Sequence, residues 1–133
     1  MNDQAIEQEI RAKGLTAPRV TPTDIEANIA SEHYFTASEG ALGAQTMALA
    51  RANGGTADGE FDLADEALQP LHLLTFCVLV LRNGFTVTGE SACASPENFD
   101  AEIGRKIARQ NAVQKIWPLM GYELKQQLHD AAQ

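Results

Sequence analysis

The fold of this chain is decided by one stretch, Leu74-Thr75-Phe76-Cys77-Val78-Leu79-Val80-Leu81-Arg82-Asn83-Gly84-Phe85-Thr86-Val87-Thr88-Gly89-Glu90. It consists of an apolar run, an Asn-Gly pair and a second run in which apolar and polar residues alternate. Asn-Gly between two strand-like runs is a strong hairpin signal, because both central residues of a type I′ turn need a positive φ. We therefore predict an antiparallel β-hairpin that turns at Asn83-Gly84.

A two-residue turn also determines which residues of the hairpin share a face. It pairs Val80 with Val87 and Val78 with Gly89. One face then carries Phe76, Val78, Val80, Phe85 and Val87, and the other carries Cys77, Leu79, Leu81, Thr86, Thr88 and Glu90. Because the first strand is apolar on both faces, we expect helices on one side and a second chain or the N-terminal helix on the other.

Helical patterns precede the hairpin. A helix is predicted over residues 3–13, where Gly14 ends it, and an Ala-rich helix over 41–53. Between them, Thr21-Pro22-Thr23-Asp24 forms a helix start with Thr21 as N-cap, and this helix is expected to continue to about Tyr34.

Two further helices are predicted after the hairpin. The first begins at the N-cap Asn98 and reaches Trp117, and Pro118 separates it from a second helix over 122–129. An apolar stripe on the first helix consists of Phe99, Ile103, Ile107, Val113 and Trp117, with Trp117 expected in the core. Gln110 and Gln114 interrupt this stripe, which predicts either bonds across an oligomer interface or the lining of a polar pocket.

These elements predict a single α+β domain of 133 residues, with a small antiparallel sheet packed against helices. Its parts are an N-terminal helical part (1–37), a variable loop or insertion (38–70) and a core motif of hairpin and helices (71–133). Within the insertion, residues 54–70 are predicted as a surface loop with a helical turn near 63–68.

The formal charge of −8 argues against general affinity for nucleic acid, although Arg105, Lys106, Arg109 and Lys115 gather on one segment. Cys77 and Cys93 are not opposite each other in the hairpin, so both are predicted to be reduced, buried thiols. Neither a signal peptide nor an apolar run of membrane-spanning length is apparent in the sequence. The chain is therefore expected to be soluble and intracellular.

Enzymatic and metal-binding patterns are weak. His33, His72 and His129 are scattered without ligand spacing, so neither a metal nor another cofactor is expected. Ser91 and Cys93 lie close to Glu90, but the sequence places no histidine beside them. We expect no catalytic residues and no enzymatic activity.

Residues 74–93 and several later motifs resemble a family of small proteins of tailed phages and prophages. The later motifs are Pro96-Glu97-Asn98-Phe99-Asp100, Ile103-Gly104-Arg105-Lys106-Ile107-Ala108-Arg109, Asn111-Ala112, Ile116-Trp117-Pro118 and Gly121-Tyr122. The resemblance covers about 74–130, and residues 21–37 resemble the N-terminal helix of the family less distinctively. This family in turn resembles the first type of Thoeris anti-defence proteins, which bind cyclic ADP-ribose isomers and, in some members, cyclic oligonucleotides.

The resemblance implies a non-enzymatic protein that sequesters an immune signal in the cytoplasm of the infected or lysogenic host. It also implies self-association as a homodimer or a trimer of dimers. The charge and the short apolar run of residues 74–81 predict no nucleic-acid and no membrane partner. The alternative is a phage accessory protein with a structural or protein-interaction role and no small-molecule ligand.

Candidate ligand contacts follow from the chemistry of nucleotides, which need cations for phosphate and flat surfaces for the base. Arg105 and Arg109 are one helical turn apart, which suits two phosphates, although surface arginines are as common at this spacing. The remaining candidates each have a structural alternative, such as packing, capping or solvent exposure: Phe85 for stacking, Asn98 for a polar contact, and Thr88 and Glu90 for ribose or an exocyclic amine. The ligand is expected between the hairpin and the helix of residues 98–109.

Overall fold

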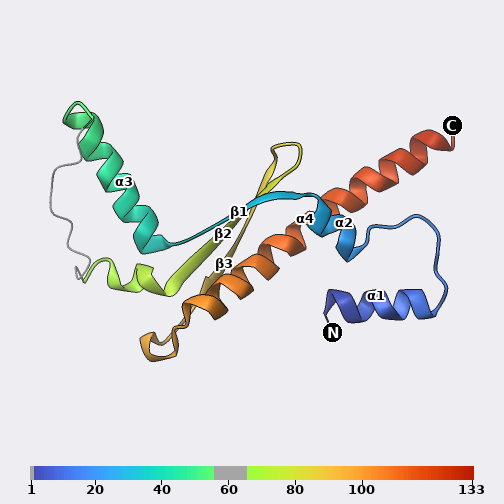
Figure 1. Cartoon of the computed structure of the whole chain (residues 1–133), viewed down its shortest axis with the longest axis horizontal. Helices are drawn as coiled ribbons and strands as arrows, with labels where there is room; N and C mark the ends of the chain where they lie inside the picture. Colours follow the sequence, from blue (N-terminus) through green and yellow to red (C-terminus); the bar gives the residue numbers. More distant parts are fainter. Residues whose placement is uncertain (1, 56–65) are drawn as a thin grey trace.

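The computed structural model describes residues 2–55 and 66–133 (Figure 1). Within these ranges the chain forms helices packed against a three-stranded antiparallel sheet, so the predicted α+β class is confirmed. The elements in chain order are α1 (Asp3–Ala12), α2 (Pro22–Ala27), β1 (Ile29–Thr36), α3 (Ala37–Ala52), η1 (Gln69–Leu73), β2 (Leu74–Leu81), β3 (Thr86–Ala92), η2 (Pro96–Asn98) and α4 (Ala101–Ala131).

The sheet has the order β1-β2-β3, so the apolar strand β2 is central. Strand β1 corrects the prediction of a helix from Thr21 to Tyr34, because α2 ends at Ala27. The start of α2 is as predicted, since Thr21 and Asp24 form a capping box. After Asn28 the chain pairs with β2, because the backbone groups of a buried strand need partners on both edges and this requirement outweighs local helix propensity.

The hairpin turn differs from the prediction. The amide of Leu81 donates to the carbonyl of Phe85 at 2.8 Å, which closes a three-residue loop over residues 82–84. Gly84 has a φ of 90°, whereas no non-glycine residue of the described chain has a positive φ. The predicted type I′ turn is therefore wrong, and the left-handed residue of the longer loop is Gly84 alone.

The extra loop residue shifts β3 by one position. Leu79 pairs with Val87 and Cys77 with Gly89, instead of the predicted pairs Val80 with Val87 and Val78 with Gly89. Because side chains alternate along a strand, this shift moves every β3 side chain to the opposite face from the one predicted. Thr88 consequently shares a face with Val78.

Helix α4 is a single helix of 31 residues, which corrects the prediction of two C-terminal helices. Pro118 lies inside it and removes one backbone donor, yet residues on both sides remain helical. Its N-cap is Asp100, whose side chain accepts from the amide of Ile103 at 3.0 Å, whereas Asn98 belongs to η2. Figure 1 shows α4 crossing the sheet, with its C-terminal half extending beyond it.

The core lies between α4 and one face of the sheet. The buried residues of α4 are small or β-branched: Gly104, Ala108, Ala112, Val113 and Ile116. They pack against a sheet face that includes Cys77, Leu79, Leu81 and Val87. The predicted apolar stripe of the helix is wrong in part, because Ile103 and Ile107 are exposed.

Gly89 explains why small residues face the sheet. A Cβ atom on Gly89 would lie 2.1 Å from the carbonyl oxygen of Ala108 and 2.3 Å from the amide nitrogen of Ala112. The helix backbone thus rests directly on β3, and larger side chains at this crossing would separate the two elements.

The other face of the sheet is only partly covered. It carries the Phe35–Phe76 ring pair, whose centroids are 5.6 Å apart, followed by Val78 and Val80. The start of α3 packs on Phe35 through Gly40, but Phe35 remains 37% exposed and the two valines are half-buried. The apolar pattern of β2 predicts cover on both faces of the sheet, but within the described chain this face has little.

Helix α3 extends from the end of β1, as Figure 1 shows, and includes the predicted helix of 41–53 except for its last residue. The predicted loop of 54–70 is described only in part. Of its expected turn at 63–68, residues 63–65 lie outside the described residues and residues 66–68 form a turn, and the last two residues of the predicted loop belong to η1. Cys77 and Cys93 are both free thiols, but Cys93 is half-buried rather than buried. No helix in the described ranges is long and apolar enough to cross a membrane.

We predict that Gly89→Ala lowers the free energy of unfolding by about 3 kcal/mol or more, because the added methyl group forces the α4 backbone off β3. Gly121→Ala in the same helix is the matched control, since nothing lies within 4 Å of its Cβ position. The control should stabilise the protein by up to about 1 kcal/mol. Urea unfolding measures both, and equal effects would contradict the close contact at Gly89.

Candidate functional site

Arg109 joins three elements of the fold. Its Nε donates to Glu32 of β1 at 2.8 Å, and its Nη1 and Nη2 donate to the two carboxylate oxygens of Glu26 of α2 at 3.0 and 2.7 Å. These bonds hold the pKa of Arg109 above its ordinary value, and those to Glu26 contribute most. The bond from Arg109 holds the pKa of Glu32 below its ordinary value. Arg109 is thus a fixed cation with two carboxylate partners.

Arg105 lies one turn earlier on α4 and has a different environment. It is exposed, and it forms no hydrogen bond or ion pair within the part of the chain that the structure describes. The structure therefore does not present the two arginines as an equivalent pair for two phosphates.

The other predicted contacts are dispersed. Phe85 lies at the hairpin tip and is 56% exposed, and Asn98 is exposed in η2. Thr88 and Glu90 lie on the sheet face that α4 does not cover, as a result of the shifted register. At the crossing point, the predicted space between hairpin and helix is filled by the contact of α4 with Gly89.

The structure instead has a cleft of about 770 Å³ between the start of α1, α2 and α4. We call it the polar cleft. Its lining includes Asp3, Glu26, Lys106, Arg109, Gln110, Asn111, Gln114 and Trp117. Gln110 and Gln114, for which the sequence left an interface and a polar pocket open, are both part of this lining.

A smaller hollow of about 230 Å³ adjoins the polar cleft beneath α1. We call it the apolar groove, because Ile6, Ile10, Val20, Pro22 and Trp117 form most of its lining. Asp3, Pro22, Gln114 and Trp117 line both hollows. The two hollows are therefore adjacent along α1 and meet at Trp117.

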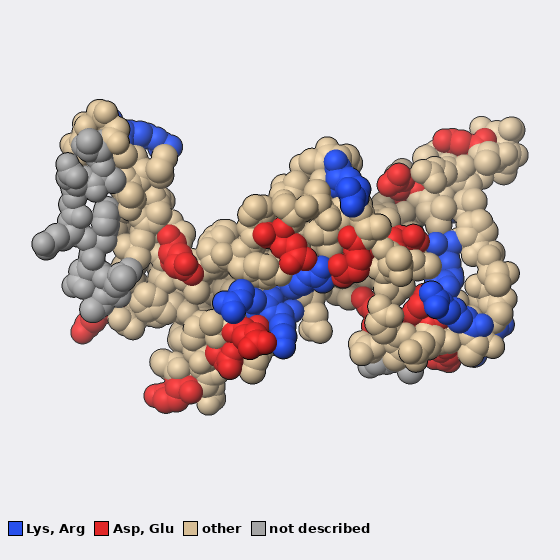
Figure 2. Space-filling model, viewed as in Figure 1, with Lys and Arg blue, Asp and Glu red and all other residues tan. Residues whose placement is uncertain are grey.

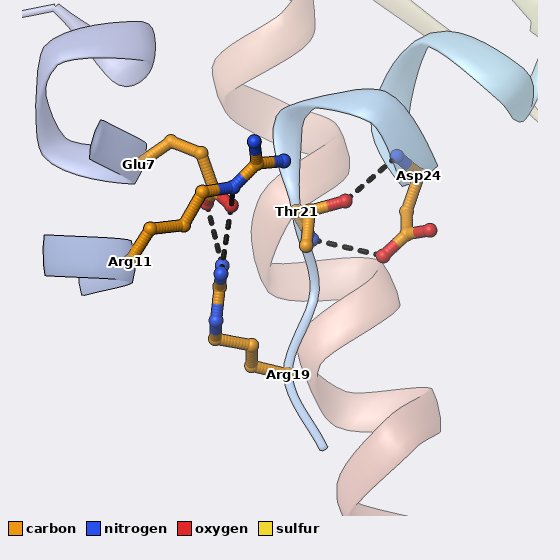
Figure 3. Close-up of polar contacts among 5 residues, drawn as sticks. All are labelled: Glu7, Arg11, Arg19, Thr21 and Asp24. Carbon is orange, nitrogen blue, oxygen red and sulfur yellow. Dashed lines mark hydrogen bonds and ion pairs between the residues drawn. The ribbon is translucent and has the colours of Figure 1, made fainter. Parts of the chain in front are cut away.

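Two sets of polar bonds hold α1 in place. One carboxylate oxygen of Asp3 accepts from Trp117 at 3.2 Å and from Gln114 at 3.3 Å. The buried carboxylate of Glu7 accepts from Arg19 at 2.5 and 2.7 Å and from Arg11 at 3.0 Å (Figure 3). The bonds from Arg19 chiefly hold the pKa of Glu7 below its ordinary value.

Charge is mixed around these hollows. Figure 2 shows Lys and Arg atoms across the middle of the visible face, with Asp and Glu atoms on either side. Lys106 forms a 3.3 Å ion pair with Glu102, but both side chains are more than two-thirds exposed, so the pair is weak. Of the cations that line the polar cleft, Lys106 is the less constrained.

A serine and a histidine also meet in the structure. Nδ1 of His72 lies 2.6 Å from Oγ of Ser38, which is also 2.8 Å from the hydroxyl of Thr36. Ser38 is buried, so this contact connects α3 to η1 inside the protein. The described residues contain no group of His, Cys, Asp and Glu side chains suited to a metal ion.

Five residues around the two hollows and Arg109 were not predicted from the sequence as site residues: Asp3, Glu7, Glu26, Glu32 and Lys106. Lys106 had a signal, because it belongs to the cluster of cations on the later segment. Glu26 and Glu32 had none, since they meet Arg109 across 83 and 77 positions of the chain.

Residues 20–128 match the model of the phage protein (N4 Gp49/phage Sf6 gene 66) family. The match covers more of the chain than the motifs recognised in the sequence, and it begins after α1. No curated protein and no solved structure matches the chain.

We predict that Glu7→Gln destabilises the protein at about pH 7, and that this effect shrinks below about pH 4. The pKa of Glu7 is lower in the folded chain than in the unfolded chain. Its ion pairs therefore stabilise the fold above the ordinary carboxyl pKa, and this contribution is lost as the pH falls through the folded-state pKa. Urea unfolding at several pH values measures the difference, and a difference independent of pH would exclude an ionised Glu7 as the cause.

Proposed function

The chain belongs to the phage protein (N4 Gp49/phage Sf6 gene 66) family, and we propose that it binds and sequesters a cyclic nucleotide immune signal without converting it. The class of signal comes from the resemblance to Thoeris anti-defence proteins, which bind cyclic ADP-ribose isomers and, in some members, cyclic oligonucleotides. The protein would act in the cytoplasm of the infected or lysogenic host, by keeping the signal from its effector.

The polar cleft is the observation that carries this proposal. Its volume of about 770 Å³ is within the range of small-molecule sites. The amides of Gln110, Asn111 and Gln114 carry both donors and acceptors, which suits the edges of a base and the hydroxyls of ribose. The nitrogens of Asn111 and Gln114 already donate to the Glu90 carbonyl and to Asp3, so each keeps one N–H and its oxygen for a ligand. Lys106 and Arg109 supply cations for phosphate.

Arg109 sets a condition on phosphate binding. Its three hydrogen-bonding nitrogens already donate to Glu26 and Glu32, and these three residues together carry one positive and two negative charges. The Glu26 side chain is 54% exposed, whereas the Glu32 side chain is 36% exposed and also accepts a hydrogen bond from Tyr34. A phosphate would therefore replace Glu26 on the guanidinium, while Glu32 keeps Arg109 in position.

Capture without conversion is tested by binding and release. The protein is incubated with cyclic ADP-ribose isomers and with cyclic di- and trinucleotides, separated from free ligand and then denatured by heat. Intact ligand released only after denaturation is the expected result. Degraded ligand would indicate an enzyme, and no retained ligand would contradict the proposal.

We predict that Lys106→Ala weakens binding of the retained nucleotide by about tenfold, the loss expected for one charge-assisted phosphate contact. Arg105→Ala is the matched control, because the neighbouring Arg105 is also exposed but does not line the polar cleft. It should change the dissociation constant less than about twofold. Isothermal titration calorimetry measures both dissociation constants. A larger loss of affinity in Arg105→Ala than in Lys106→Ala would place the ligand on the helix face predicted from the sequence.

The open sheet face favours a second candidate function, association between copies of the chain. Phe35, Phe76, Val78 and Val80 form a partly exposed apolar strip along the sheet. A second copy packed on this face would remove the strip from water, as the two apolar faces of β2 led us to expect. We propose a homo-oligomer that forms through this face, which would serve either a signal-binding or a structural protein.

We predict that Val78→Asp raises the dissociation constant of the oligomer at least about tenfold, because it places a carboxylate in the apolar strip. Gln45→Asp adds the same charge on an exposed position of α3 and should leave association unchanged. Sedimentation velocity over a range of concentrations measures the association. A monomeric wild-type protein, or equal effects of the two substitutions, would contradict this interface.

A further inference from the structure

The polar cleft and the apolar groove have opposite chemical characters. Lys106, Arg109 and Gln110 line only the polar cleft, whereas Ile6, Ile10 and Val20 line only the apolar groove. A ligand that occupies both must therefore carry an anionic or polar group at one end and an apolar, ring-sized group at the other.

Two features make the apolar groove suitable for an aromatic ring. The Trp117 indole nitrogen donates to Asp3, which holds its half-buried ring at the junction of the two hollows. Glu7 also lines the groove, but its carboxylate is bound by Arg19 and Arg11. An incoming ring would thus meet Trp117 and isoleucine side chains, while the Asp3 carboxylate at the junction is held by hydrogen bonds from Trp117 and Gln114.

Helix α1 supplies one wall of each hollow. Residues 2–4 line the polar cleft, and Ile6, Glu7 and Ile10 line the apolar groove. The family match starts at residue 20, after α1, whereas the opposite wall on α4 lies inside the match. Residues 20–128 alone, without α1, would leave the polar cleft and the apolar groove open on the side opposite α4.

We propose that α1 is the specificity-determining element of this site, and that with Trp117 it selects a ligand which joins an anionic group to an aromatic ring. This inference rests on the proposed function, because the base and phosphate of a nucleotide are such a pair. Phosphate would contact Lys106 and Arg109, and the base would enter between Ile6 and Trp117. Members of the family without this helix would then hold different ligands.

A fluorescent aromatic anion, 1-anilinonaphthalene-8-sulfonate, tests this inference without knowledge of the natural ligand. Trp117 is the single tryptophan of the chain, so energy transfer from tryptophan reports dye bound to the protein, and its loss in an Ile6 variant assigns that dye to the groove beneath α1. We expect saturable energy transfer in the wild-type protein. Ile6→Asp should weaken it at least about tenfold, because the new carboxylate lies in the apolar groove.

Leu15→Asp is the matched control, since Leu15 is also exposed, follows α1 in the chain and lines neither hollow. It should leave the energy transfer unchanged. Circular dichroism checks that each variant is folded, and Ile6→Ser replaces Ile6→Asp if the charge prevents folding. No energy transfer in the wild-type protein, or equal losses in the Ile6 and Leu15 variants, would overturn the inference.

The outcome is separable from that of the proposed function. If cyclic nucleotides are retained and released intact by Ile6→Asp as by the wild-type protein, the signal is captured but α1 does not select it. If no cyclic nucleotide is retained while the dye binds in an Ile6-dependent manner, the site accepts aromatic anions and the proposed signal class is wrong.

Discussion

The direct contact between the backbone of α4 and Gly89 of β3 is the constraint on which the rest of the structure depends. It places Ala108 and Ala112 against the sheet and brings the Cys77–Leu79 face of β2 into the core. A helix this close to the sheet leaves no space for a ligand at the crossing. Binding sites must therefore lie beside the crossing or on the opposite face of the sheet.

Charged side chains then position the elements that surround this crossing. Arg109 connects α4 to α2 and β1, and Arg19 connects the segment before α2 to Glu7 of α1. Because guanidinium groups bind carboxylates in a fixed planar geometry, these pairs orient the helices as well as attract them. In this acidic chain, these arginines are therefore paired with carboxylates. Of the two cations that line the polar cleft, Lys106 has the weaker ion pair.

The two proposed interaction surfaces occupy different parts of the molecule. The polar cleft and apolar groove lie between α1 and α4, whereas the apolar strip of the sheet lies on the face that α4 does not cover. Ligand capture and self-association can thus occur together, with the shared fold supplying the sheet and α4. Helix α1, outside the family match, adds the second wall of the proposed ligand site.

Local patterns determined the hairpin, the capping box at Thr21, the Ala-rich helix α3 and the α+β class, because each depends on neighbouring residues. The sequence by itself also identified Arg109 as a candidate and Gln110 and Gln114 as residues that interrupt an apolar stripe. Only the tertiary structure decided the hairpin register, since Gly84 permits a longer loop and Gly89 must face α4. It also decided that residues 29–36 form a strand, because the edge of β2 needed a partner from a distant segment. The partners of Arg109 and the cleft beside it likewise depend on residues that are far apart in the chain and become neighbours only when α4 lies across the sheet.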